Sequence, residues 1–306
     1  MKAIHSYTIA LAAIMTLAFF GSYTNDSIPG GVQPQFPNTS YGPQYMRAVK
    51  MSSYIDFAGE RVPIENFDVK ERLDREIHKN TFFHSSMFHY IKLSNRYFPI
   101  IEPILAEYGV PNDFKYLAVA ESGLRNAVSS AGARGIWQFM KGSARHFKLV
   151  IDNEVDERYN VEKATRAACK HLLEDKRRFG SWAMAAASYN MGSPRLRKQL
   201  TSQQVNKYYD LHLNDETSRY LFRIIAIREV MKNPEKHGFL YDYDDLYPQF
   251  NSYQTITVSG SISSLASFAK KHGTTYRKLK IYNPWLRMPY LKNSARRTYQ
   301  IKVPYS

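Results

Sequence analysis

The stretch from residue 80 to residue 233 consists of segments with apolar residues at helical spacing, and most of these segments end at a glycine. One segment covers residues 98–108 and ends at Gly109, and a longer one covers residues 161–179 and ends at Gly180. Glycine is favoured just past a helix because it adopts a left-handed backbone conformation without strain. The alternation that marks β-strands is nearly absent here. These features predict a mainly α-helical domain.

Shorter helices complete this prediction. Pro111 suits the first turn of a helix, and Gly123 suits the position just past its end. The other predicted helices cover residues 143–150, residues 182–190 behind a capping Ser181, and the stretch from a capping Asn214 or Asp215 to Met231. Earlier in the chain the signals are weaker, and they indicate only a strand near residues 61–64 and a helix from about Val69.

The chain changes character after Gly238, where an acidic and aromatic connector begins. Residues 255–258 and 299–303 have the pattern of short strands. Residues 261–271 and 275–282 lie between them and have helical spacing. The sequence therefore predicts a small βααβ module, which we assign to residues 252–306.

The first 24 residues have the layout of a secretory signal peptide. Lys2 precedes an apolar run over residues 9–20, and this run is short for a membrane-spanning helix. Cleavage of the segment and its retention as a membrane anchor are both open, but no cysteine follows that could carry a lipid. We therefore expect an exported protein of the periplasm or cell envelope. Residues 25–79 are assigned as a linker and N-terminal extension, and residues 80–240 as the helical domain.

The chain carries a formal net charge of +15, from 42 Lys and Arg against 27 Asp and Glu. This excess indicates an anionic partner, which on charge alone is nucleic acid, anionic lipid or an acidic polymer. The export signal argues against nucleic acid. Cys169 is the only cysteine, which excludes an intrachain disulfide and a cysteine-rich metal site. Its helical surroundings predict a small buried hydrophobic residue.

Glu121 is a carboxylate in an otherwise apolar helix, and it shares a face with Phe114, Leu117 and Ala118. Desolvation on that face disfavours the charged form and should raise the pKa of the carboxyl group. Its place in the last helical turn acts in the same direction, because the helix dipole is negative there. A carboxyl group kept protonated near neutral pH is suited to general acid catalysis. The alternative is an ordinary surface glutamate at a helix end.

Four stretches of sequence, in order, decide between these interpretations. They are residues 130–140 (SAGARGIWQFM), 156–158 (DER), 187–192 (ASYNMG) and 216–220 (ETSRY), and all of them follow residues 121–124 (ESGL). In this order and spacing they resemble the family 1 soluble lytic transglycosylase domain, and within it the branch that includes membrane-bound lytic murein transglycosylase D. The resemblance covers residues 95–232 and implies a lysozyme-like helical fold.

The resemblance also implies roles for individual residues. Glu121 matches the family's single catalytic acid and base. Substrate-binding roles are implied for Ser122, Trp137, Gln138, Met140, Tyr189, Asn190 and Tyr220. For Trp137 and Tyr220 core packing is the alternative. The departures from the family pattern are Ile136, Lys141, Asn160 and Ser188, in place of the usual Leu, Pro, Asp and Ala. Because Glu121, Gln138, Tyr189 and Asn190 are intact, an active enzyme is expected.

A family member of this kind cleaves the β-1,4 bond between N-acetylmuramic acid and N-acetylglucosamine in peptidoglycan and leaves a 1,6-anhydromuramyl end. One carboxylate can suffice because some glycosidases use a group on the substrate in place of the second. No metal ion or cofactor is implied, and nucleic acid is not an expected partner, whereas membrane association through the N-terminus is left open. The alternatives are a hydrolytic muramidase of the same fold and a catalytically idle wall-binding protein.

The C-terminal module resembles a LysM domain in residues 257–274, 279–286 and 301–304. It departs from the usual pattern at residues 260–262, where Gly-Ser-Ile replaces Gly-Asp-Thr, and in the long span over residues 287–297. The resemblance implies binding of glycans that contain N-acetylglucosamine. The alternative is a degenerate module that only packs against the rest of the protein.

Overall fold

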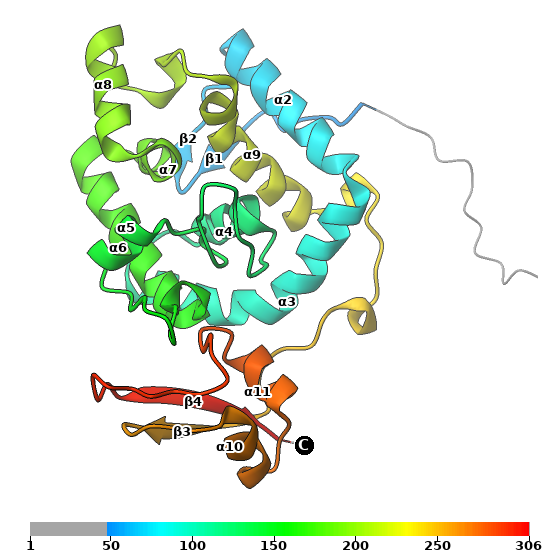
Figure 1. The fold of residues 1–306 in the computed structure, drawn as a ribbon. Helices are drawn as coiled ribbons and strands as arrows, with labels where there is room; N and C mark the ends of the chain where they lie inside the picture. The colour runs from blue at the N-terminus through cyan, green and yellow to red at the C-terminus, as the bar shows by residue number, and fades with distance from the viewer. Residues whose placement is uncertain (1–47, 306) are drawn as a thin grey trace, which may run out of the picture. The chain divides into compact units, whose positions relative to one another are not determined.

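The computed structural model describes residues 48–305 (Figure 1), so the signal segment predicted at residues 1–24 lies outside the described part of the chain. The described chain begins with a short hairpin of β1 (Asp56–Phe57) and β2 (Glu60–Arg61) and continues into α2 (Phe67–Thr81). The hairpin lies ahead of the strand predicted near residues 61–64, because Ala58 and Gly59 turn the chain with φ of 55° and 78°.

Helix α3 (His84–Glu107) is longer than the segment predicted at residues 98–108. Pro99 and Pro103 lie inside it, and each removes one backbone donor from the helical ladder. The prolines are four residues apart and therefore fall on the same side of the helix. The first half of α3 falls within the stretch predicted to be helical from residue 80, but its start at His84 was not predicted, and the packing of Met87 and Ile91 into the core stabilises it.

The next elements bring Glu121 to a helix end, as predicted. A single 3-10 turn, η1 (Asn112–Phe114), precedes α4 (Lys115–Ser122), and Gly123 ends α4 in the left-handed conformation with φ of 60°. Helix α5 (Lys141–His146) is shorter and earlier than the predicted residues 143–150, because Lys148 takes a left-handed φ of 69° and reverses the chain. The turn η2 (Glu157–Tyr159) follows.

The remaining helices agree closely with the sequence. Helix α6 (Val161–Phe179) ends at Gly180 as predicted, and Ser181 caps α7 (Trp182–Met191) by accepting a hydrogen bond from the backbone of Met184. Asn214, one of two predicted caps, begins α9 (Asp215–Lys232). The other elements are α8 (Ser193–Gln203), η3 (Tyr208–Asp210), η4 (Pro234–His237) and η5 (Tyr243–Asp245).

Helix α9 is the central element of the helical domain and packs against α2, α4 and α7 (Figure 1). Its residues 220–227 are buried except for Arg223, so nearly every side of the helix contacts other elements. The predicted burial of Cys169 is confirmed, and burial raises the pKa of its thiol to about 12. No helix in the described residues is both long and apolar enough to span a membrane.

The predicted βααβ module is also confirmed. It consists of β3 (Tyr253–Val258), α10 (Leu265–Lys271), α11 (Tyr276–Tyr282) and β4 (Tyr299–Pro304). The strands are antiparallel, with Ile256 opposite Ile301. Helix α10 begins later than the predicted residue 261, because Ser264 caps it and Ile262 pairs with Leu291 instead. The fold class is therefore mainly α with a small βααβ module.

Candidate active site

Glu121 lies in the last turn of α4, and its carboxyl group faces α9. The Tyr220 hydroxyl of α9 donates a hydrogen bond to Oε1 of Glu121. Tyr220 is only 1% exposed, so this donor is fixed within the core, whereas Glu121 is half-buried. Tyr220 thus contacts the carboxyl group of Glu121, the predicted catalytic residue. Its buried ring also makes the core contacts that the alternative interpretation required.

Burial raises the pKa of the Glu121 carboxyl group, as the sequence predicted. The Tyr220 hydrogen bond and the positive charge of Arg223 act against this rise, and the negative charge of Glu216 adds to it. Sequence analysis did not assign roles to Arg223 or Glu216. The signal for both was their spacing on α9. Glu216 lies four residues before Tyr220 and Arg223 three residues after it, which places all three on one side of the helix.

Tyr189 and Asn190 lie near the end of α7, and the charge of Glu121 acts on Tyr189. The Tyr189 hydroxyl donates to the carbonyl oxygen of Trp137 at 2.7 Å. Burial raises the pKa of Tyr189 well above its ordinary value, and the nearby Glu121 charge raises it further, so the phenol remains protonated. Asn190 is partly exposed, and its side chain has no hydrogen-bond partner within residues 48–305. Its amide is therefore available to a ligand.

A loop over residues 132–139 contacts Ser122, the residue that follows Glu121. The Ser122 hydroxyl donates to the carbonyl oxygen of Ile136 at 2.9 Å, which ties the end of α4 to this loop. Gln138 takes a left-handed φ of 48°, and its side-chain Nε2 donates to the carbonyl oxygens of Ala127 and Gly135 at 3.1 and 2.8 Å. Its amide nitrogen therefore holds the loop, and its Oε1 is the atom left to meet a ligand. Met140 follows the loop and is 46% exposed.

Trp137 requires a correction, because the structure places it in the core and not on the wall of a cleft. Its side chain is 0% exposed, and its indole N–H donates to Oγ1 of Thr165 at 2.9 Å. A large aromatic ring with its donor satisfied inside the protein has no surface left for a glycan. Trp137 contributes to the site through its carbonyl oxygen, which accepts from Tyr189.

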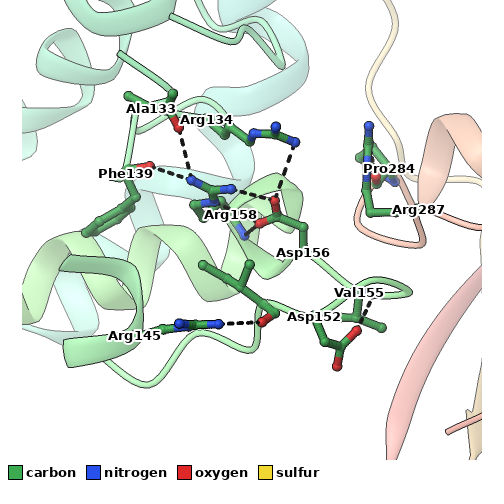
Figure 2. A network of polar contacts seen from close by, with 12 residues as sticks. Ala133, Arg134, Phe139, Arg145, Asp152, Val155, Asp156, Arg158, Pro284 and Arg287 are labelled. Atoms are coloured by element: carbon green, nitrogen blue, oxygen red, sulfur yellow. Dashed lines mark hydrogen bonds and ion pairs between the residues drawn. The ribbon is translucent and has the colours of Figure 1, made fainter. Parts of the chain in front are cut away.

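A buried ion pair holds the loop over residues 132–139 through hydrogen bonds to its backbone (Figure 2). Asp156 binds Arg158 through two contacts, at 2.9 Å to Nε and 2.8 Å to Nη2. Arg158 in turn donates to the carbonyl oxygens of Gly132 and Phe139, both at 3.2 Å. A Cβ on Gly135 would lie 1.9 Å from the carbonyl oxygen of Arg158, so only glycine fits there.

The acidic residues 152–157, whose placement the sequence left open, have carboxylates engaged by other groups. Asp156 is occupied by Arg158, and the Glu157 carboxylate pairs with Lys163 while accepting from the backbone of Val150. These contacts leave neither residue in position to act as a partner of Glu121. Among the acidic residues of the described chain, Glu216 is the one whose charge acts on the Glu121 carboxyl group.

Comparison with known families matches residues 98–211 to the transglycosylase SLT domain and residues 254–306 to the soluble lytic transglycosylase C-terminal LysM-like domain. The chain contains an SLT transglycosylase domain. The predicted resemblance is confirmed, and so is the LysM-like character of the module. The SLT match includes Glu121, the loop over residues 132–139, and the Tyr189–Asn190 pair, but it ends before α9, which supplies Tyr220.

Proteins similar to this chain come from Escherichia coli and an Alteromonas species. Membrane-bound lytic murein transglycosylase D of Escherichia coli is 24% identical over 225 residues, which is 72% of this chain and 48% of that protein. A protein of an Alteromonas species named for tributyltin chloride resistance is 30% identical over 95 residues, 30% of this chain and 46% of its own length. The chain thus spans about half the length of the curated relatives it matches.

A solved structure of an inactive mutant of the lytic transglycosylase Slt from Pseudomonas aeruginosa is also similar to this chain. It is 18% identical, with a TM-score of 0.39. The similarity covers 52% of this chain and 28% of that one.

Proposed function

We propose that the protein is a peptidoglycan lytic transglycosylase in which Glu121 is the only catalytic acid and base. The observation that carries the proposal is the half-buried Glu121 carboxyl group, whose pKa is raised by burial and whose Oε1 is held by Tyr220. A carboxyl group that is still protonated near neutral pH can give its proton to a leaving oxygen. The SLT domain and the name of the Escherichia coli relative support the same activity.

In the first step, Glu121 protonates the oxygen that joins N-acetylmuramic acid to N-acetylglucosamine. The bond from C1 of the muramic acid to this oxygen breaks, and positive charge develops at C1. The substrate's own N-acetyl group stabilises this charge, as happens in glycosidases that lack a second carboxylate. Asn190 is suited to hold the N-acetyl group because its side-chain amide has no partner within the described residues.

In the second step, the ionised Glu121 accepts a proton from the C6 hydroxyl of the same sugar. The C6 oxygen closes onto C1 and gives a 1,6-anhydro end, and Glu121 returns to its protonated form without consuming water. Between the two steps the carboxylate is stabilised by the Tyr220 hydroxyl and by the positive charge of Arg223. Tyr189 remains a neutral phenol throughout, because its raised pKa keeps its proton in place.

A hydrolytic muramidase is the second candidate, and Glu216 is the observation that favours it. Glu216 is exposed in the first turn of α9, and its charge raises the pKa of Glu121. An inverting glycosidase uses a second carboxylate to activate water. Under this alternative Glu216→Gln abolishes cleavage. Under the proposed mechanism the same change only lowers the pKa of Glu121 and leaves most of the activity.

The deciding experiment is digestion of purified peptidoglycan sacculi followed by mass spectrometry of the released fragments. Anhydro ends are lighter by one water than hydrolytic ends, so each mechanism has its own product mass. Glu121→Gln is the matched control, since it keeps the shape of the side chain and removes its proton. Release of hydrated ends, or equal release by wild type and Glu121→Gln, would contradict the proposal.

We also propose that the protein acts in the cell envelope, where peptidoglycan is found. The support is the export-type N-terminal sequence and the name of the membrane-bound relative. The net charge of +15 suits a glycan strand whose peptide stems carry carboxylates. Fractionation of cells that produce the full chain, with detection in the periplasmic and membrane fractions, tests this placement.

A further inference from the structure

One segment of the helical domain, residues 152–159, contacts the LysM-like module directly. Val155 pairs with Leu286 in an isolated β-bridge. Within this bridge region the backbone N–H of Arg287 donates to the carbonyl oxygen of Glu154 at 2.7 Å, and that of Asp156 donates to the carbonyl oxygen of Trp285 at 2.9 Å. The segment is therefore joined to the module by backbone hydrogen bonds.

Side chains strengthen this attachment. The Glu154 carboxylate accepts from the backbone N–H groups of Lys292 and Asn293 at 2.8 and 3.2 Å. The guanidinium group of Arg287 lies 4.3 Å from the centre of the Tyr159 ring, and Arg297 pairs with Asp152 at 3.3 Å. Such a combination of backbone and charged contacts fixes the segment in one position.

Apolar packing adds to these polar contacts. Val155 and Tyr159 belong to the same buried cluster as the core of the module, which includes Leu265, Leu279 and Ile301. The module's core is thus completed by side chains from the helical domain. Burial of this kind is the largest favourable contribution to holding two parts of a protein together.

The opposite side of the segment holds the loop at the candidate active site. Arg158 is 4% exposed, is paired with Asp156, and binds the carbonyl oxygens of Gly132 and Phe139 (Figure 2). These two carbonyl groups lie at the two ends of the loop over residues 132–139. Arg158 therefore holds the two ends of the loop together.

The loop in turn contacts the residues around Glu121. Ser122 donates to the carbonyl oxygen of Ile136, and Tyr189 donates to that of Trp137. Contacts consequently run without a break from the module, through residues 152–159 and Arg158, to the loop that carries Gln138. The links from Asp156 through Arg158 to the loop are an ion pair and hydrogen bonds among buried or partly buried residues, whereas Arg287 and Lys292 on the module are exposed.

We infer that the LysM-like module positions the active site, because it fixes the segment whose Arg158 holds the loop beside Glu121. Glu154 and Arg287 are positioning residues in this scheme, and neither touches the substrate. The backbone N–H groups of Lys292 and Asn293 already donate to Glu154, so these groups bind the helical domain and not a glycan. The effect on turnover rests on the proposed function, but the effect on the loop does not.

The test compares Glu154→Ala with Glu154→Gln in the full chain. Alanine removes the acceptor for both N–H groups, whereas glutamine keeps an oxygen that can accept them. Lys270→Ala is the matched control, since Lys270 is exposed on α10 away from the attachment. Arg287→Ala is a second variant that removes an exposed side chain, which contacts the Tyr159 ring and donates to the carbonyl oxygen of Pro284 at 3.0 Å.

The first measurement is amide hydrogen exchange at Arg134 and Phe139, whose backbone groups bond each other across the loop at 3.1 Å. We expect exchange at both amides to rise about tenfold in Glu154→Ala, to rise less in Arg287→Ala, and to stay at the wild-type rate in Glu154→Gln and Lys270→Ala. Exchange at Ile256 and Ile301 reports whether the module itself stays folded. If it does not, the Arg287→Ala result decides.

The second measurement is the rate of cleavage of a short soluble muropeptide glycan. A misplaced loop should lower kcat by about 10- to 100-fold in Glu154→Ala with little change in KM. Unchanged exchange in the loop overturns the inference, whether or not the protein cleaves peptidoglycan. An unchanged kcat despite faster exchange also overturns it, as does a rise in KM that appears only with long strands. Failure of wild type to cleave, by contrast, rejects the proposed function and leaves the exchange result to stand.

Discussion

Removal of the Tyr220 hydroxyl gives the sharpest test of how the protein controls the Glu121 proton. Tyr220→Phe keeps the ring, which is 1% exposed and packed in the core, and deletes only the donor to Oε1 of Glu121. This donor favours the ionised carboxyl group, so it lowers the pKa that burial raises. Its loss should therefore raise the pKa of Glu121 further.

The size of the change follows from the strength of the bond. A hydrogen bond to a charged group contributes about 1.5–3 kcal/mol. One pKa unit corresponds to about 1.4 kcal/mol of difference between the two protonation states. The loss of a contribution of this size should raise the pKa of Glu121 in Tyr220→Phe clearly, and the general acid should stay protonated to a correspondingly higher pH.

The assay is the pH dependence of kcat/KM for release of soluble fragments from sacculi. In wild type the basic limb reports loss of the Glu121 proton, and in Tyr220→Phe this limb should move to higher pH. Tyr208→Phe is the control, because its buried hydroxyl donates only to the carbonyl oxygens of Thr217 and Ser218. It should lower stability without moving the limb. An unmoved limb in Tyr220→Phe, or a shift to lower pH, would refute this account of the site.

Three further predictions concern Glu121, Gly135 and Trp137. Glu121→Gln should lower kcat by at least about 10²-fold. Because the pKa of Glu121 is raised in the folded state, wild type loses stability as pH rises through that pKa. The stability of the glutamine variant relative to wild type, measured by chemical denaturation, should therefore grow from acidic to neutral pH. Gly135→Ala should lower the unfolding free energy by more than about 2 kcal/mol in the same assay, since φ is 79° and the added Cβ meets the carbonyl oxygen of Arg158. Trp137→Phe should lower it by about 1–3 kcal/mol and leave KM unchanged, because the ring bonds Thr165 inside the core; a large rise in KM would restore the predicted role in substrate binding.

Local signals in the sequence predicted most of the helices. The ends of α6 and α7 were predicted because Gly180 and Ser181 act through contacts with their immediate neighbours. The start of α3 was not predicted, because residues 84–97 are held by packing against distant segments and their own spacing is weakly amphipathic. Helix α5 was misplaced for a related reason, since the left-handed Lys148 that ends it has no distinctive residue type.

The candidate site shows the same division between local and distant signals. Glu121 could be singled out because an acidic residue in an apolar helical turn is a local anomaly. Its hydrogen-bond partner lies 99 residues further along the chain, and the resemblance to a family supplied Tyr220 where spacing could not. Trp137 was misassigned because a motif gives the order of residues and not the direction of their side chains. The ring points to Thr165 on α6, and only the backbone of Trp137 faces the site.

The proposed two-step reaction requires one carboxyl group to give a proton and then to take one within a single turnover. A pKa displaced far upward makes the protonated group a weaker acid for the first step and the ionised group a stronger base for the second, and a pKa displaced far downward does the reverse. Burial and the charge of Glu216 on α9 act upward, and Tyr220 and Arg223 on α9 act downward on the same group. Because Glu121 lies on α4 and these three groups lie on α9, the packing of α4 against α9 sets the balance between them. Substitutions that shift this packing without touching Glu121 should therefore change the pH of maximal activity before they abolish it.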